Sequence, residues 1–250
     1  IVVWSTFMKK YNYENISEST HVTHLWEPLK FTLKDNYRYI SKSKLFSFFS
    51  NLIAAIIFPI LIILNKILFG FKIENKDKVL KNTGFVSVSN HVHYMDCTMI
   101  ALLYFPKRVY FPTLQSNFKI PFIRHLIKIL YAIPIPTKDN QKVSFYNDIN
   151  ETLLNKKIVQ MYPEASMWPY YEKVRSFKYG AFKMAVTANV PIQPLKFVFQ
   201  EPTGIYKLYK RKKCLHLVVL DPIYPDLSLP PKERIADLRD KAYNAINKGE

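Results

Sequence analysis

Glycine and cysteine are both scarce in this sequence, and each scarcity argues against a class of protein. Only five glycines occur among 250 residues, and neither GxGxxG nor GxxxxGK[ST] is present. This argues against a nucleotide-binding domain built on a glycine-rich loop. The two cysteines, Cys97 and Cys214, fit no metal-binding spacing. We therefore expect two free thiols in a reducing compartment.

Acidic residues are also too few to balance the basic ones. The sequence has 36 Lys and Arg against 19 Asp and Glu, which gives a net charge of +17. Such an imbalance implies an anionic partner, either nucleic acid or an anionic membrane surface. Hydrophobic residues make up 49% of the chain, so a buried core is expected rather than disorder.

One long stretch, residues 45–64, carries no charge and reads LFSFFSNLIAAIIFPILIIL. Its length is near the minimum for crossing a bilayer. Asn51, Pro59 and the lysines on both sides weaken that interpretation and give no clear orientation. A spanning helix, a helix or hairpin in the interface of one leaflet, and a buried core helix all stay open. We expect membrane contact, because so apolar a segment suits lipid and offers nothing to nucleic-acid phosphates.

From residue 84 onward, short β-rich runs alternate with longer helical patterns. This alternation predicts an α/β domain with a mixed, largely parallel sheet flanked by helices. We place a boundary near residue 75, between an N-terminal helical, membrane-associated segment (1–74) and the α/β domain (75–250). The expected strands cover residues 85–89, 109–111, 131–135, 158–162, 192–199 and 215–220, and the expected helices cover residues 96–105, 121–130, 143–155, 177–188 and 231–248.

A histidine and an aspartate follow the first predicted strand, in NHVHYMD at residues 90–96. On one continuous helix His91 and Asp96 would not share a face, because five residues correspond to about 500°. They can meet if His91 lies on the strand-to-helix turn and Asp96 in the first helical turn. The carboxylate would then bind one imidazole nitrogen and leave the other as a general base. A purely structural pair is the alternative for these two residues taken alone.

A metal site is a further alternative for the same segment. His91, His93 and Asp96 offer two imidazoles and a carboxylate. The HxHxDH pattern of metallo-β-lactamase-type hydrolases is not matched, because Met95 and Asp96 occupy its Asp and His positions. The remaining histidines lie in no ligand-like cluster, so no metal is expected.

A second polar group, in YPEASMW at residues 162–168, follows the predicted strand at 158–162. Glu164 and Ser166 would lie on a loop at the edge of the sheet where ligands gather. Cationic side chains that could help to hold a phosphate-bearing head group follow at Lys173, Arg175 and Lys178.

Taken in order, these segments resemble the motifs of the lysophosphatidic acid acyltransferase family, the 1-acyl-glycerol-3-phosphate O-acyltransferases. The family's NHxxxxD motif is matched in full by Asn90, His91 and Asp96. Order and spacing agree over roughly residues 50–200. The family's FPEGTRS motif is matched at Pro163 and Glu164 and conservatively at Tyr162, Ala165 and Ser166, its FKxGA stretch by residues 177–181, and its VPIxPV motif by residues 190–195.

The resemblance implies a glycerolipid-acyltransferase-like fold and acyl transfer to 1-acyl-glycerol-3-phosphate, giving phosphatidic acid. His91 would deprotonate the acceptor hydroxyl, and Asp96 would orient His91 and stabilise its charged form. The alkoxide would attack the thioester of acyl-CoA or acyl carrier protein. No cofactor, metal or covalent acyl-enzyme is needed. Asn90, Glu164 and Ser166 would help to position the acceptor.

Two positions depart from the family. A further family motif ends in an arginine after a strand, and in this chain Thr137 stands at that position, after residues 132–136. Met167 stands at the position of the arginine in the FPEGTRS motif, the third motif of the family. In the family both arginines are associated with binding the acceptor phosphate. Thr137 itself, with Lys138, Arg175 and Lys178, is then expected at the acceptor site. Alternatively, the acceptor is a different lyso-lipid, an amino-acid lipid or a glycolipid, or the enzyme is a lipid hydrolase.

The positive charge fits an enzyme that takes its substrate from an anionic bilayer. The densest basic cluster is KLYKRKK at residues 207–213. It fits anionic lipid headgroups, an acidic acyl carrier protein or a solvated hairpin. We expect a membrane-associated enzyme with its active site on the cytoplasmic side, and with no nucleic-acid partner.

Overall fold

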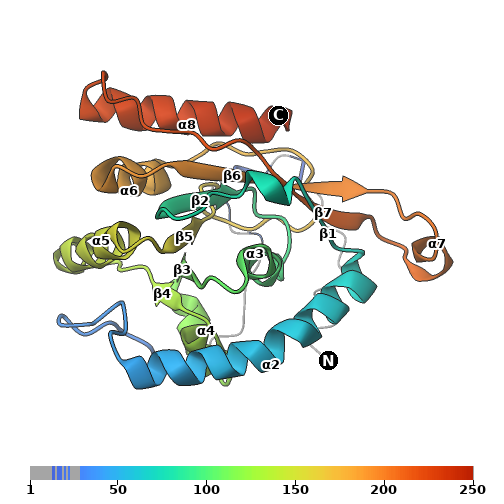
Figure 1. The fold of residues 1–250 in the computed structure, drawn as a ribbon, viewed down its shortest axis with the longest axis horizontal. Coiled ribbons are helices and arrows are strands. Elements are labelled where there is room, and N and C mark those ends of the chain that lie inside the picture. Colours follow the sequence, from blue (N-terminus) through green and yellow to red (C-terminus); the bar gives the residue numbers. More distant parts are fainter. Residues whose placement is uncertain (1–12, 15, 19, 21, 23–28, 250) are drawn as a thin grey trace.

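The structure is a computed structural model that describes residues 13, 14, 16–18, 20, 22 and 29–249. In this part of the chain, a seven-stranded sheet carries helices on both faces (Figure 1). The strands are β1 (Lys72–Glu74), β2 (Phe85–Ser89), β3 (Val109–Thr113), β4 (Ala132–Pro134), β5 (Ile158–Met161), β6 (Ile192–Gln200) and β7 (Cys214–Val219). The helices are α2 (Lys44–Phe69), α3 (Asp96–Tyr104), α4 (Ile123–Ile129), α5 (Asp139–Leu154), α6 (Gly180–Ala188), α7 (Tyr206–Tyr209) and α8 (Pro231–Lys248), with 3-10 turns η1 (Lys76–Lys78) and η2 (Gln115–Lys119).

The strand order is β1-β7-β6-β2-β5-β3-β4. Neighbouring strands are parallel except for β6 and β7, which are antiparallel. The expectation of a mixed, largely parallel sheet is therefore confirmed. β2 lies between β6 and β5, and all five of its residues are buried. This central position is typical of a parallel strand that is covered on both faces.

The helices form layers on the two sides of the sheet (Figure 1). α5, α6 and α8 cover one face, where Val86 and Phe182 belong to one buried cluster. α3 covers the other face, where Met99 belongs to the same cluster as Phe85. α2 lies outside α3 as a further layer and packs against it through Phe58. The centre of the sheet is thus covered on both faces, while α2 keeps many exposed apolar side chains.

α2 contains the apolar run expected from the sequence and extends it to 26 residues. Ser43 caps its start by accepting a hydrogen bond from the backbone N–H of Phe46, and Gly70, with φ of 58°, ends it. Its buried residues form one narrow stripe, and eleven of its large apolar side chains are exposed. The alternative of a buried core helix is therefore wrong. By length and composition, α2 is the one helix in the described residues that could cross a membrane.

Two short elements were not expected from the sequence. β1 pairs in parallel with β7, so the sheet begins at residue 72, just before the boundary placed near residue 75. α7 has four residues. Elements this short are too brief to show a periodic pattern. The boundary itself stays a prediction, and the first twelve residues of segment 1–74 lie outside the described residues.

Cys97 and Cys214 are both free, as expected.

Gly84 allows β2 to start directly against the end of α5. A methyl group on its Cα would collide with the backbone carbonyl of Leu153, which cannot rotate away. We expect Gly84→Ala to lower the free energy of unfolding by about 2 kcal/mol, measured by chemical denaturation. Gly180→Ala is the matched control, because nothing lies within 4 Å of its added methyl group. Equal stability of the two variants would contradict this account.

Candidate active site

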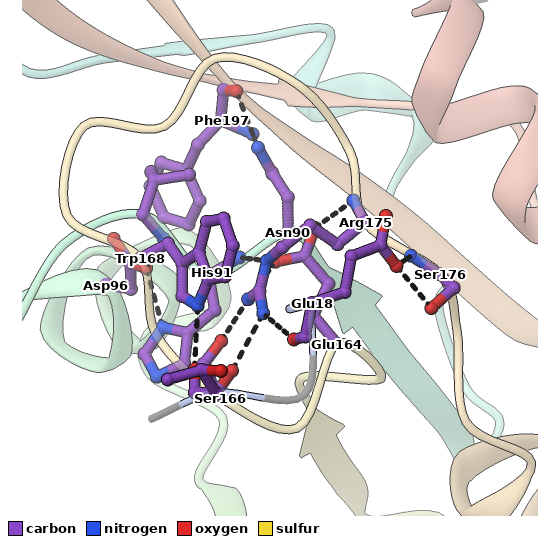
Figure 2. Close-up of polar contacts among 12 residues, drawn as sticks. Glu18, Asn90, His91, Asp96, Glu164, Ser166, Trp168, Arg175, Ser176 and Phe197 are labelled. Atoms are coloured by element: carbon purple, nitrogen blue, oxygen red, sulfur yellow. Dashed lines mark hydrogen bonds and ion pairs between the residues drawn. The ribbon is translucent and has the colours of Figure 1, made fainter. Parts of the chain in front are cut away.

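His91 and Asp96 lie on the turn that leads from β2 into α3 (Figure 2). His91 Nδ1 is 2.9 Å from Asp96 Oδ2. The contact that the spacing predicts is therefore present. It forms because β2 ends at Ser89 and the helix starts only at Asp96, so the intervening turn can bring the imidazole back over the first helical residue.

The Asp96 carboxylate is held in one orientation. It is fully buried, and Oδ2 also accepts hydrogen bonds from the backbone N–H groups of Val92, at 2.8 Å, and His93, at 3.0 Å. A carboxylate fixed in this way accepts the Nδ1–H of the imidazole and leaves the lone pair on Nε2. The pair therefore has the geometry of a general base with its orienting acid.

Tyr162 fixes the His91 ring from a second direction. The two rings are stacked, with centroids 3.9 Å apart and an interplanar angle of 15°. The His91 side chain is 24% exposed, and no residue that the structure describes donates to or accepts from its Nε2. The ring of His91 is thus restrained but partly exposed, and its Nε2 has no hydrogen-bond partner among the described residues. Sequence reasoning treated Tyr162 only as a motif position, and no local pattern could have indicated this stacking.

A buried ion pair lies behind the turn (Figure 2). Arg175 Nη2 is 2.8 Å from Glu164 Oε2, and both side chains are buried. The same carboxylate accepts the backbone N–H of His91 at 3.2 Å and that of Arg175 at 3.0 Å. Burial raises the pKa of Glu164, against the opposing effect of the Arg175 charge. Glu164 therefore ties the YPEASMW loop to the backbone of the proposed base.

The Arg175 guanidinium points into the protein. It donates to Ser166 Oγ at 2.7 Å, to the Ser166 carbonyl and to the Glu18 carbonyl, and it lies over the Trp168 ring. The structure therefore gives Glu164, Ser166 and Arg175 a role in holding the loop together. Their predicted contact with the acceptor stays a prediction.

Asn90 joins the end of β2 to β6. Its Nδ2 donates to the Phe197 carbonyl at 3.0 Å, and its Oδ1 accepts the Phe197 N–H at 2.8 Å. The amide thus continues the strand pairing by one residue beyond β2. On the other side of the turn, the backbone N–H of Trp168 donates to the His91 carbonyl at 3.1 Å. The predicted role of Asn90 in binding substrate stays a prediction.

The remaining residues expected at the acceptor site are not gathered at His91. Thr137 and Lys138 are exposed between β4 and α5, three strands away from β2, or roughly 14 Å at the usual strand spacing. The Lys178 side chain is exposed, and its backbone N–H donates to the Pro163 carbonyl at 2.8 Å. All three lie at connections that follow the carboxyl ends of strands, but none touches the histidine–aspartate pair. Their role in binding the acceptor stays a prediction.

His93 is a second buried histidine, which the sequence indicated only as a metal ligand. Its ring contacts those of Phe69 and Tyr170, and Nδ1 accepts the backbone N–H of Met95 at 3.1 Å. Burial lowers the pKa of His93 to about 4. In the part of the chain that the structure describes, no three His, Cys, Asp or Glu side chains converge on a possible metal position.

Known proteins share both the sequence pattern and the fold. Residues 70–198, just over half of the chain, match the family described as Acyltransferase. The chain therefore belongs to this family and is an acyltransferase. A 1-acyl-sn-glycerol-3-phosphate acyltransferase of Bacillus subtilis (strain 168) is 25% identical over 179 residues, which are 71% of this chain and 86% of that protein. The resemblance inferred from the motifs is confirmed.

A solved structure supports the fold. The crystal structure of the 1-acyl-sn-glycerophosphate (LPA) acyltransferase PlsC from Thermotoga maritima is similar, with a TM-score of 0.51 and 20% sequence identity. The similarity covers 71% of each chain. The glycerolipid-acyltransferase-like fold expected from the sequence is therefore confirmed.

Replacing the Asp96 carboxylate by an amide tests its orienting role. In Asp96→Asn, the amide no longer selects the imidazole tautomer that has its lone pair on Nε2. We expect kcat for acyl transfer to fall on the order of a thousandfold, with a small change in KM, in initial-rate assays. Asp139→Asn is the matched control, because Asp139 is also the first residue of a helix but is exposed. A fall of less than tenfold in Asp96→Asn would contradict the orienting role.

The lowered pKa of His93 predicts a dependence of stability on pH. Between pH 6.5 and about 4 the unfolded chain takes up a proton on this histidine that the folded chain does not. Stability therefore falls as the pH is lowered through this window, by about 3 kcal/mol in total. His93→Asn removes the titrating group and retains an acceptor for the Met95 N–H. Denaturation curves across the window should show a shallower pH dependence in the variant, and parallel curves would refute the assignment.

Proposed function

We propose that the chain transfers a fatty acyl group from an acyl thioester to the free hydroxyl of 1-acyl-glycerol-3-phosphate, giving phosphatidic acid. The observation that carries the proposal is the His91–Asp96 hydrogen bond, which orients an accessible Nε2 at the carboxyl end of the central strand. The choice of acceptor rests on the Bacillus subtilis relative, whose name states this substrate.

In the proposed reaction, His91 Nε2 takes the proton of the acceptor hydroxyl. The hydroxyl oxygen attacks the thioester carbonyl, and the buried Asp96 stabilises the imidazolium that forms. As the carbon–sulfur bond breaks, the thiolate leaves and takes the proton from the imidazolium. The products are an ester and a free thiol, and His91 returns to its starting state. The step needs no metal, cofactor or covalent acyl-enzyme, and either acyl-CoA or acyl carrier protein supplies the thioester.

α2 is proposed to lie in the plane of the membrane interface. Phe46, Phe58 and Phe69 each contact an aromatic ring of the α/β domain, so the helix touches the protein from its start to its end. Its 26 residues are about 39 Å long. Standing upright in a bilayer, α2 would draw Arg108 and Lys128 into the hydrocarbon. Lying flat, it inserts its exposed apolar face and leaves the active site in the aqueous phase, which we propose is the cytoplasm.

Removing the imidazole of His91 tests the proposed reaction. We expect His91→Ala to lose at least a thousandfold in kcat with 1-acyl-glycerol-3-phosphate and labelled acyl-CoA or acyl carrier protein in detergent micelles. His125→Ala, which removes an exposed histidine of α4, should keep the wild-type rate. Circular dichroism checks that both variants are folded. Full activity of a folded His91→Ala enzyme would refute the mechanism.

A different lyso-lipid, an amino-acid lipid or a glycolipid is the second candidate acceptor. It follows from Thr137 and Met167, which occupy the positions of two arginines in the family. The same assay with a panel of lyso-lipids, amino-acid lipids and glycolipids identifies the acceptor. Highest kcat/KM with 1-acyl-glycerol-3-phosphate would support the proposal. Higher kcat/KM with an acceptor that lacks the phosphate would replace it, and release of free fatty acid alone would indicate a hydrolase.

A further inference from the structure

The connection between β6 and β7 forms an arm, residues 201–213, which extends beyond the sheet with α7 near its tip (Figure 1). Ile205 and Leu208 on this arm are 68% and 84% exposed. Two apolar side chains this exposed at a tip are unfavourable in water unless something covers them. Around them lies the densest basic cluster of the chain, Lys207, Lys210, Arg211, Lys212 and Lys213.

The arm is fastened to the carboxyl end of α2. Tyr209 donates its hydroxyl to the Ile67 carbonyl at 2.8 Å, and Lys210 Nζ donates to the Leu68 carbonyl at 2.7 Å. These bonds satisfy carbonyl groups that the end of a helix leaves without partners. Gly70 has no room for a side chain because Cys214, the first residue of β7, lies against it, and the Tyr206 ring of the arm lies beside the same position. The arm and the end of α2 therefore form one surface, on which the exposed Ile67 and Leu68 continue the apolar tip.

The surface formed by the arm and the end of α2 borders the turn between β2 and α3, which carries the proposed base. Phe69, the last residue of α2, contacts the His93 ring with centroids 4.6 Å apart. The Lys212 ammonium lies 4.5 Å from the centre of the Tyr170 ring. Tyr170 in turn donates its backbone N–H to the Val92 carbonyl at 2.8 Å. Only one side chain thus separates the arm from the backbone of the turn that carries the proposed base.

We propose that residues 201–213 dock on an anionic lipid bilayer, with Ile205 and Leu208 inserted among the acyl chains and Lys207 and Arg211 at the phosphates. The inference deepens the proposed function and rests on it, because it names the surface that presents the active site to an acceptor held in the bilayer. With α2, the arm gives a second contact with the membrane. A domain held by α2 alone could rotate about the axis of that helix. A second contact through the arm fixes the tilt of the domain relative to the membrane.

The combination of charges and apolar tips favours a bilayer over an acidic carrier protein. A carrier protein would neutralise the lysines of the arm. It offers no hydrocarbon for Leu208 or for the exposed face of α2, which is continuous with the tip. A bilayer with anionic headgroups binds the basic side chains at its surface and the apolar side chains in its hydrocarbon.

The depth of the arm tip can be measured on the full chain. We expect the added fluorescence of Leu208→Trp, above that of the three native tryptophans, to be quenched by vesicles of phosphatidylcholine and phosphatidylglycerol brominated on their acyl chains. Leu227→Trp is the matched control, because Leu227 is also an exposed leucine but lies between β7 and α8. Quenching of Leu208→Trp no greater than that of Leu227→Trp would overturn the proposal.

The charges of the arm are tested by sedimentation with the same lipids without bromine. We expect Lys207→Gln/Arg211→Gln to lower the partition coefficient onto phosphatidylglycerol-containing vesicles about thirtyfold, with little effect on pure phosphatidylcholine. Lys156→Gln/Lys157→Gln removes two exposed charges before β5 and should leave partitioning and activity unchanged. Melting temperatures show whether each variant is folded.

Two further outcomes separate this inference from its alternatives. An arm variant that partitions like the wild type but shows a raised KM for acyl carrier protein alone would overturn the bilayer proposal and identify a protein-binding arm. Vesicle binding does not require turnover, so it can also be measured in His91→Ala. If the wild-type enzyme bound vesicles through the arm but acylated no acceptor, the proposed reaction would be refuted while the docking surface stayed intact.

Discussion

The buried carboxylate of Asp96 is the group on which the geometry of the candidate active site depends. Burying a carboxylate oxygen is costly unless hydrogen bonds replace those to water, and Oδ2 obtains three, from His91 Nδ1 and from two backbone N–H groups of the turn. This requirement gives the turn between β2 and α3 a single conformation. Glu164 then binds the His91 N–H from the other side. The direction of the proposed base is thus set by backbone contacts as much as by its own side chain.

The YPEASMW loop, residues 162–168, keeps its place at the end of β5 although several residues of the family's FPEGTRS motif are replaced in it. Ala165 occupies the position of the motif glycine and has φ of 66°, a left-handed conformation that costs an alanine about 1 kcal/mol. The loop is nevertheless held, because the Arg175 guanidinium bonds both the hydroxyl and the carbonyl of Ser166. Arg175 therefore lies beside this loop, but its buried guanidinium binds Glu164 and Ser166 inside the protein and does not replace the arginine missing at Met167.

The proposed base and the two surfaces proposed to contact the membrane lie close together in the structure. α2 carries an exposed apolar face along its length, and its last residue touches a ring of the NHVHYMD turn. The arm between β6 and β7 is bonded to the same helix end. The high positive charge of the chain acquires a physical role in this arrangement, since basic side chains beside an apolar surface favour anionic headgroups over water.

The local sequence pattern determined most of the secondary structure and the histidine–aspartate contact. Alternating apolar runs predict the larger strands and helices, and only four residues lie between His91 and Asp96, so a turn suffices to bring them together. Tertiary structure alone decided that Tyr162 stacks on His91, that Arg175 points inward and that the arm is bonded to α2. The first and last of these contacts join residues far apart in the chain, and the Arg175 contact crosses a loop that has no periodic pattern. They depend on which strands become neighbours and which side of each segment is buried, and no local periodicity encodes either.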